Sequence, residues 1–243
     1  MKKRRWFSLF LSFALLLPLF SLTSADAYED FDLDAKAGLL IEADTGEILY
    51  EKNAHQENFP ASLTKVMVAL LVFEAIDEGK IALTDSVTAT ESAFEGLSSD
   101  GSTANIVPGE TMTVEQLLNC MLIVSANEAC NILGETLYGS VDAFVARMNE
   151  RATELGCEHT HFANATGLHN SQHYTTAWDL YLITREAMKH DKFMEICNSK
   201  SYTVPATNMT DKPRELHSTN FLISNWRARG YVYRDAQGIK TGS

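Results

Sequence analysis

Residues 60–79 read PASLTKVMVALLVFEAIDEG, and this stretch decides the fold. It predicts a helix that begins just after Pro60 and ends at Gly79, which is placed to be the C′ residue. Ser62 and Lys65 lie three residues apart near its start, so they share one face of the helix. The apolar residues of the stretch recur at helical spacing and are Leu63, Val66, Met67, Leu70, Leu71 and Ile76.

Outward from this helix, the chain places strands at its two ends and helices between them. Residues 37–41 and 47–51 predict two strands of a hairpin, joined by a turn. Residues 231–241 predict hairpin strands again. This order favours an α+β fold, in which the N- and C-terminal strands form one antiparallel sheet with a helical block packed on it. Further helices are predicted in the middle of the chain, at about residues 113–123, 126–139, 140–156 and 176–190. Two of them start with capping pairs, Thr113 with Gln116 and Thr176 with Asp179.

The first 27 residues predict a secretory signal and not a part of the fold. A basic segment at residues 2–5 precedes an apolar run at 6–20 and the small-residue pattern Ala25-Asp26-Ala27. The apolar run is short for a membrane-spanning helix, so a cleaved signal is favoured over a membrane anchor. We therefore expect an exported protein of the extracytoplasmic cell envelope.

The charge argues against one class of partner. The whole chain carries a formal charge of −12, and removing residues 1–27 takes away four basic residues and one acidic residue, which leaves −15. Such acidity argues against nucleic acid as a partner, because binding to phosphates depends on Lys and Arg.

The cysteines leave two alternatives open. Their spacing contains no C-x-x-C pair, and an exported chain could pair them in several ways, so no disulfide is predicted. Cys157, His159 and His161 occupy every second position. This spacing fits a small metal cluster or a loop that enters a strand, and we favour the loop. The four cysteines are Cys120, Cys130, Cys157 and Cys197.

The Ser-x-x-Lys pair at Ser62 and Lys65 is the first candidate for chemistry. A serine hydroxyl is a poor nucleophile until a neighbouring base removes its proton. A lysine can be that base only if burial or a nearby cation lowers its pKa. The helix N-terminus also offers N–H groups where an oxyanion would develop. The alternative is an ordinary helix start with a solvated lysine, and the motif alone does not choose.

Two further short motifs are equally ambiguous alone. In Ser125-Ala126-Asn127, the serine can relay a proton and the asparagine can hold a substrate amide, or Ser125 is only an N-cap. Ser218-Thr219-Asn220 has the same pattern. In Lys240-Thr241-Gly242, a lysine on a strand can grip a carboxylate and the glycine allows close approach, or the segment is an edge strand with an exposed lysine.

Taken in order, these motifs are the set found in penicillin-binding proteins and class A β-lactamases. Residues 36–243 resemble the low-molecular-mass penicillin-binding proteins that act as serine D-alanyl-D-alanine carboxypeptidases. The resemblance assigns the Ser-x-Asn motif to residues 125–127 and not to residues 218–220. It also places His161 in a family block just before residues 164–167, which weakens the metal alternative. It rests on AGLLIEADTGEILYEKNAHQ, FPASLTKVMVALL, VPGETMTVEQLLNCMLIVSANEAC, HFANATGLHNSQHYTTAWDLYLI and GIKTGS.

The resemblance implies catalytic roles. Ser62 would be the nucleophile that attacks the carbonyl of the penultimate D-alanine, and Lys65 its general base. Ser125 would pass a proton to the departing D-alanine, and Asn127 would orient the substrate and Lys65. Water would then hydrolyse the acyl-enzyme, with no metal or organic cofactor.

The resemblance also implies a substrate-binding group and partners. Lys240 and Thr241 would bind the terminal carboxylate of a peptidoglycan stem peptide, with Gly242 beside them. The backbone N–H groups of Ser62 and Ser243 would form the oxyanion hole. β-Lactam antibiotics such as penicillins would acylate Ser62, because they place a strained amide carbonyl next to a carboxylate.

Related functions on the same scaffold stay open. A D,D-endopeptidase would carry the same motifs. A class A β-lactamase is disfavoured, since no E-x-x-L-N stretch lies between Asn127 and Lys240. A non-catalytic or inactive truncated wall-binding protein is disfavoured because it would need no nucleophile and base together.

The family pattern extends beyond the last motif, into further strands, a C-terminal helix, a smaller β-rich domain and often an amphipathic membrane anchor. We therefore expect residues 28–243 to be a penicillin-binding catalytic domain that is truncated after the Lys-Thr-Gly strand. Peripheral membrane association would use a C-terminal segment that this sequence lacks. Because the last strand would be an unpaired edge, the chain as written is expected to be poorly folded or inactive.

Overall fold

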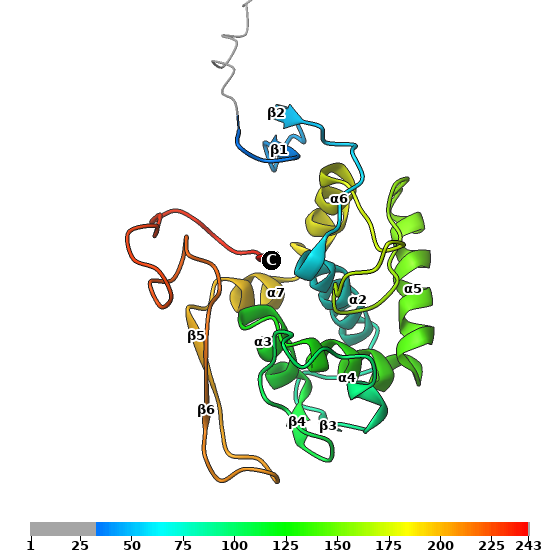
Figure 1. Cartoon of the computed structure of the whole chain (residues 1–243), viewed down its shortest axis with the longest axis vertical. Coiled ribbons are helices and arrows are strands. Elements are labelled where there is room, and N and C mark those ends of the chain that lie inside the picture. Colours follow the sequence, from blue (N-terminus) through cyan, green and yellow to red (C-terminus); the bar gives the residue numbers. More distant parts are fainter. Residues whose placement is uncertain (1–32, 243) are drawn as a thin grey trace, which may run out of the picture.

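The structure is a computed structural model that describes residues 33–242 (Figure 1). The predicted signal at residues 1–27 and the predicted oxyanion residue Ser243 lie outside the described residues. The mixture of helices and short antiparallel strands confirms the α+β class. The elements in chain order are β1 Gly38–Ile41, β2 Ile48–Lys52, η2 Ala61–Thr64, α2 Lys65–Asp77, β3 Ser86–Thr88, η3 Ser92–Phe94, β4 Thr111–Thr113, α3 Val114–Ile123, α4 Asn127–Tyr138, α5 Val141–Glu154, α6 Ala177–Ala187, α7 Asp191–Cys197, β5 Ser201–Val204 and β6 Arg214–His217.

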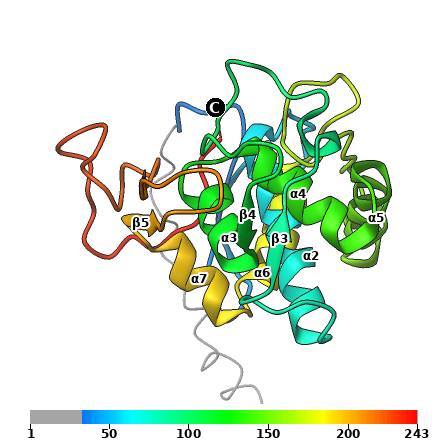
Figure 2. The same cartoon turned by 90° about the horizontal axis from the view of Figure 1, so that it is seen from below.

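Helix α2 is the centre of the core. Every side chain from Val66 to Phe73 is buried. The sequence of this segment is apolar on all sides, so the helix must be covered on all sides. Figures 1 and 2 show α2 among α3, α4, α5 and α6, all of which contact it. As a consequence, Lys65 at the start of α2 enters the core with the helix.

The surrounding helices begin where their capping residues predict. Thr113 and Gln116 form a complete capping box at the start of α3. The Ser140 side chain caps α5, and the Thr176 side chain caps α6. The first and the last predicted helices differ in extent. The first starts as the 3₁₀ turn η2 before α2, and the last stops where α6 ends at Ala187, with the short helix α7 after it.

The strands differ from the prediction at the C-terminal end. The N-terminal hairpin β1–β2 is confirmed, but it forms a sheet of its own, as do β3–β4 and β5–β6. Residues 231–241, predicted as hairpin strands, contain no strand. A strand exists only where a neighbouring backbone pairs with it, and no backbone hydrogen bond joins the described residues 239–242 to β1. The expected joint sheet of the two ends is therefore not formed by residues 33–242.

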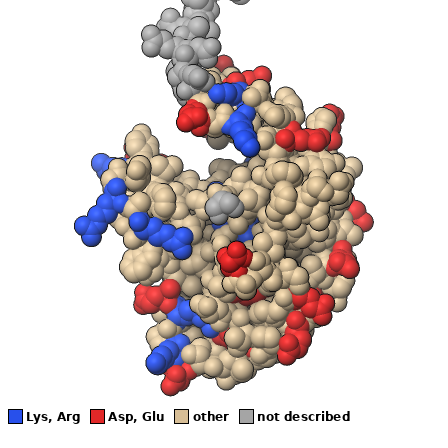
Figure 3. All heavy atoms as spheres, in the orientation of Figure 1, with Lys and Arg blue, Asp and Glu red and all other residues tan. Residues whose placement is uncertain are grey.

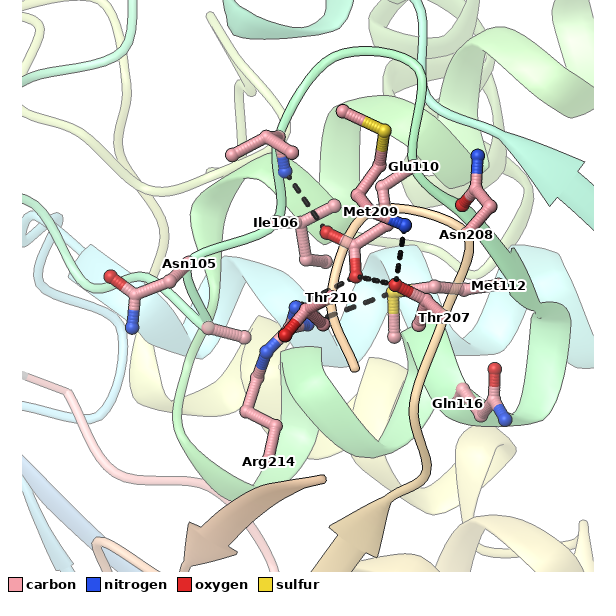
Figure 4. Close-up of polar contacts among 12 residues, drawn as sticks. Asn105, Ile106, Glu110, Met112, Gln116, Thr207, Asn208, Met209, Thr210 and Arg214 are labelled. Carbon is pink, nitrogen blue, oxygen red and sulfur yellow. Dashed lines mark hydrogen bonds and ion pairs between the residues drawn. The ribbon is translucent and has the colours of Figure 1, made fainter. Parts of the chain in front are cut away.

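The unpredicted hairpin β5–β6 is fastened to the segment before α3 by a buried carboxylate (Figure 4). Glu110 is 1% exposed and forms an ion pair with Arg214 at 2.7 Å. Its carboxylate also accepts hydrogen bonds from the Thr207 hydroxyl and from the backbone N–H of Val107. The charge is thus fully paired, as a buried charge must be, and the connection between β5 and β6 is held beside β4.

None of the described helices is both long and apolar enough to cross a membrane.

Candidate active site

The candidate nucleophile stands at the start of the central helix. Ser62 lies in η2, the single 3₁₀ turn that leads into α2. Ala61 before it has φ +48°, a left-handed conformation that is unusual for alanine. The backbone N–H of Ser62 makes no hydrogen bond to any described residue, so it is free to donate to a ligand. Strained backbone of this kind collects at functional sites.

Lys65 connects three parts of the chain. Its side chain is fully buried. The Nζ atom lies 3.1 Å from Ser62 Oγ, 2.8 Å from Asn127 Oδ1 and 2.5 Å from the Thr166 carbonyl oxygen. The structure therefore brings Ser62, Lys65 and Asn127 together, as the sequence predicted.

These three partners determine what a neutral Lys65 can do. The Asn127 and Thr166 oxygens can only accept hydrogen bonds, so they take the two N–H groups of a neutral amine. Ser62 is the partner that can also donate, and it faces the remaining lone pair. A neutral Lys65 is thus oriented to accept the Ser62 proton and cannot turn its lone pair elsewhere without losing a hydrogen bond.

Burial makes the neutral state of Lys65 accessible. Loss of hydration lowers the pKa of its ammonium, and the nearby negative charge of Glu128 opposes this shift in part. The solvated-lysine alternative for this motif is therefore wrong.

The carbonyl of Thr166 is a site element that the sequence reasoning missed. The Asn164 side chain shapes its loop: Oδ1 accepts from the N–H groups of Thr166 and Gly167, and Nδ2 donates to the Leu168 carbonyl. Gly167 has φ +86°. A Cβ atom at Gly167 would lie 1.9 Å from the Ala61 carbonyl oxygen. The loop thus lies directly against the backbone that carries Ser62, and the Asn-Ala-Thr-Gly sequence was the available signal.

Ser125 presents an unused hydroxyl next to this network. Its Oγ atom is buried and has no hydrogen-bond partner among the described residues. Its φ is +67°, again left-handed. Helix α4 has Ala126 at its N-cap position, so the alternative that Ser125 is the cap is wrong. Because a buried unpaired hydroxyl is costly, Ser125 is a group that a ligand is suited to satisfy.

A loop at residues 98–106 lies over Asn127. The backbone N–H of Asn127 donates to the Ser102 carbonyl, and a Cβ at Gly101 would lie 2.7 Å from Asn127 Nδ2. Glu128 is buried and its carboxylate accepts hydrogen bonds from the Thr103 hydroxyl and the backbone N–H of Ala104. The acidic residue after the Ser-x-Asn motif thus fixes this loop at the rim of the site.

The Lys-Thr-Gly segment reaches the same region as an extended loop. Burial, and then the nearby Lys65, lower the pKa of Lys240 to about 8. The Thr241 hydroxyl hydrogen bonds with that of Thr219 at 2.7 Å. A Cβ at Gly242 would lie 3.3 Å from the Pro60 carbonyl oxygen, so the segment passes close to the start of η2. The exposed-lysine alternative is wrong for Lys240, although the predicted strand is absent.

A histidine that the sequence reasoning did not single out supports the strained turn. The backbone N–H of Ala163 donates to His173 Nδ1, so the neutral ring carries its proton on Nε2. Nε2 lies 2.7 Å from the Thr64 hydroxyl, which donates to the Ala61 carbonyl at 2.8 Å. The ring thus acts through Thr64 on the peptide before Ser62. Burial, with His161 nearby, lowers the pKa of His173 to about 4.

This burial of His173 predicts a loss of stability in acid. The unfolded pKa is near 6.5 and the folded pKa is about 4, so below pH 6.5 the unfolded chain binds the additional proton. Between pH 6.5 and pH 4 we expect the free energy of unfolding to fall by roughly 2–3 kcal/mol from this group. Urea unfolding of wild type and His173→Gln is measured at both pH values. The fall in the free energy of unfolding from pH 6.5 to pH 4 should be larger in wild type than in His173→Gln by this amount. Equal pH slopes in the two proteins would contradict the buried neutral histidine.

The metal and disulfide alternatives receive no support from residues 33–242. No group of three or more His, Cys, Asp or Glu side chains in that range could hold a metal ion. Cys157 instead packs against α6, with Sγ 3.7 Å from the Asp179 carbonyl oxygen, and His161 pairs with Tyr174 through backbone hydrogen bonds. All four cysteines are free thiols.

The comparisons with known proteins agree on one family. Residues 23–243 match the family model of D-alanyl-D-alanine carboxypeptidase, peptidase S11. D-alanyl-D-alanine carboxypeptidase DacF of Bacillus subtilis is 39% identical over 209 residues, which are 86% of this chain and 51% of DacF. DacA of Escherichia coli K12 is 35% identical over 214 residues, 86% of this chain and 50% of DacA. The chain spans about half the length of these curated relatives.

Solved structures give the same result and confirm the predicted DD-peptidase type of fold. The crystal structure of the Streptomyces K15 DD-transpeptidase superposes with a TM-score of 0.78 at 30% identity, covering 89% of this chain and 82% of that one. Penicillin binding protein 5 from Haemophilus influenzae superposes with a TM-score of 0.73 at 29% identity, covering 81% of this chain and 55% of that one.

Proposed function

Because the chain belongs to the D-alanyl-D-alanine carboxypeptidase family of peptidase S11, we propose that it removes the terminal D-alanine from peptidoglycan stem peptides through an acyl-enzyme. The observation that carries the proposal is the arrangement at Lys65 Nζ. Two pure acceptors hold the amine, and its third contact is the Ser62 hydroxyl. This is the geometry of a nucleophile with its general base.

In the proposed acylation step, neutral Lys65 takes the proton of Ser62 while Oγ attacks the carbonyl of the penultimate D-alanine. The unpaired backbone N–H of Ser62 would donate to the resulting oxyanion, and Ser243 would supply the second donor. The unpartnered hydroxyl of Ser125 would pass a proton to the departing amine. Asn127 would keep Lys65 in place and hold the substrate amide.

The Lys-Thr-Gly segment supplies the proposed carboxylate site. Lys240 is cationic below its lowered pKa of about 8, and Thr241 offers a hydroxyl beside it. A cation with an adjacent hydroxyl is a strong binding group for the terminal carboxylate of a D-Ala-D-Ala peptide or of a penicillin. The close passage of Gly242 to the Pro60 carbonyl brings this segment beside the turn that carries Ser62.

The remaining expectations are part of the same proposal. Residues 28–243 would form the penicillin-binding catalytic domain, and residues 1–27 would direct it to the cell envelope. Peripheral association with the membrane belongs to the same proposal. Water would release the product from Ser62, and the cycle would need no organic cofactor or metal.

The test is release of free D-alanine from a soluble peptide ending in D-Ala-D-Ala. We expect release by the wild type, which would overturn the expectation from the unpaired last strand that the chain is inactive. We expect none by Ser62→Ala, because without Oγ no acyl-enzyme can form. A cross-linked muropeptide dimer, assayed in parallel, separates carboxypeptidase from endopeptidase. Cleavage of the dimer without release of terminal D-alanine would replace the proposal by the endopeptidase alternative.

A further inference from the structure

The segment between β6 and the Lys-Thr-Gly motif displays aromatic rings and arginines on an otherwise acidic chain. We call residues 221–237 the aromatic–arginine loop; they read FLISNWRARGYVYRDAQ. Trp226 is 64% exposed, Tyr231 62% and Tyr233 63%. Basic side chains gather at the left of Figure 3, where Figure 1 draws this segment in orange and red. Large exposed apolar surfaces of this kind mark interaction sites.

The three arginines of the loop have no ionic partners among residues 33–242. Arg227, Arg229 and Arg234 are exposed, and none forms an ion pair or a side-chain hydrogen bond with a described residue. The loop contains one acidic residue, Asp235. The loop therefore carries a net positive charge on a chain whose formal charge is −12, and guanidinium groups favour carboxylate or phosphate partners.

Internal contacts give the loop a defined shape. Its two sides are joined by the hydrogen bond from the Tyr233 N–H to the Leu222 carbonyl, and the rings of Phe221 and Tyr231 lie 6.3 Å apart. The Trp226 ring stacks on His217 of β6, with centroids 3.7 Å apart and an angle of 14° between the rings. One face of the indole is thus supported by the fold, while most of the side chain stays open to solvent.

The base of the loop is tied to the candidate active site. The Asn220 side chain donates to the Gly238 carbonyl at 2.6 Å, and the Thr219 hydroxyl bonds that of Thr241 at 2.7 Å. Both contacts close the loop next to the proposed carboxylate-binding segment. A ligand held at Lys240 that extends beyond its terminal residues therefore has this loop as a neighbouring surface.

We propose that the aromatic–arginine loop binds the anionic glycan–peptide polymer to which the stem peptide is attached. This inference rests on the proposed function. The exposed aromatic faces suit the apolar C–H faces of sugar rings, and the arginines suit the carboxylates that stem peptides and muramic acid units carry. The loop would add affinity for polymeric substrate without touching the reacting atoms.

The test compares binding to the polymer with turnover of a short peptide. In co-sedimentation with purified peptidoglycan sacculi at low salt, Arg227→Gln/Arg229→Gln/Arg234→Gln should bind about tenfold more weakly than wild type. Trp226→Ala should also weaken binding severalfold. Both should release D-alanine from a short soluble peptide at the wild-type rate.

The control removes the same charge elsewhere. Lys80, Lys189 and Lys212 are exposed and lie outside the loop, so their triple replacement by Gln should leave sacculus binding unchanged. Equal binding by the arginine and lysine triple variants would overturn the inference. So would binding of wild type to anionic phospholipid vesicles but not to sacculi, which would make the loop a membrane contact. Failure of the proposed function is separate, because it would abolish D-alanine release while sacculus binding still reports on the loop.

Discussion

Replacing Lys65 with methionine is expected to slow acylation by penicillin about a thousandfold, the scale on which a positioned general base contributes. Methionine has a similar length and no titratable group, so it fills the buried site without a base. The Asn127 and Thr166 oxygens lose their donor, which costs some stability. The measurement is the rate of fluorescent-penicillin labelling, with circular dichroism as a check on folding.

A second variant separates the loss of the base from the loss of the cation. Lys65→Arg keeps a positive charge, but a guanidinium cannot be deprotonated at working pH. It should therefore be as slow as Lys65→Met. Labelling within tenfold of the wild-type rate in either folded variant would remove Lys65 as the base of the reaction.

Replacing Gly167 with alanine is expected to damage both the fold and the site. The new Cβ atom would lie 1.9 Å from the Ala61 carbonyl oxygen and 2.3 Å from its carbon. No side-chain rotation can relieve a collision between a Cβ and backbone atoms, so the loop must move away from Ser62 and Lys65. We expect a loss of about 3 kcal/mol or more, seen as a fall in Tm of roughly 6–12 °C, with labelling by penicillin strongly reduced.

Gly156 provides the matched control for this substitution. It has φ +83°, close to the +86° of Gly167, but a Cβ there would meet nothing within 4 Å. Gly156→Ala therefore carries only the cost of the left-handed conformation, about 1–2 kcal/mol, and should label normally. If the two alanine variants have equal Tm values, the contact between the loop and the Ala61 backbone is not as described.

The sequence predicted those parts of the fold that local rules determine. The period of the apolar residues in 60–79 and the capping pairs at Thr113 and Thr176 act over one or two helical turns, so they can be identified without the rest of the chain. The predicted strands at 231–241 failed because pairing depends on a partner from elsewhere. The hairpin β5–β6 was missed for the same reason, since its position depends on the buried contact between Glu110 and Arg214.

The candidate site was predictable as a list of side chains but not as an arrangement. The motifs supplied Ser62, Lys65 and Asn127, and the structure brings them together. The backbone carbonyl of Thr166 and the support from His173 could not be read from residue types, because a carbonyl is common to every residue and a histidine has many roles. Their contribution depends on where the chain between α5 and α6 crosses the start of α2.

The most direct test of the account is the mass of the purified protein after incubation with penicillin G. We predict one covalent adduct per chain with the mass of the intact antibiotic, located by peptide mapping at Ser62, because attack by Oγ opens the β-lactam ring and loses no atoms. Ser62→Ala should show no adduct. A well-folded wild-type protein that stays unmodified, or an adduct that persists in Ser62→Ala, would contradict the account.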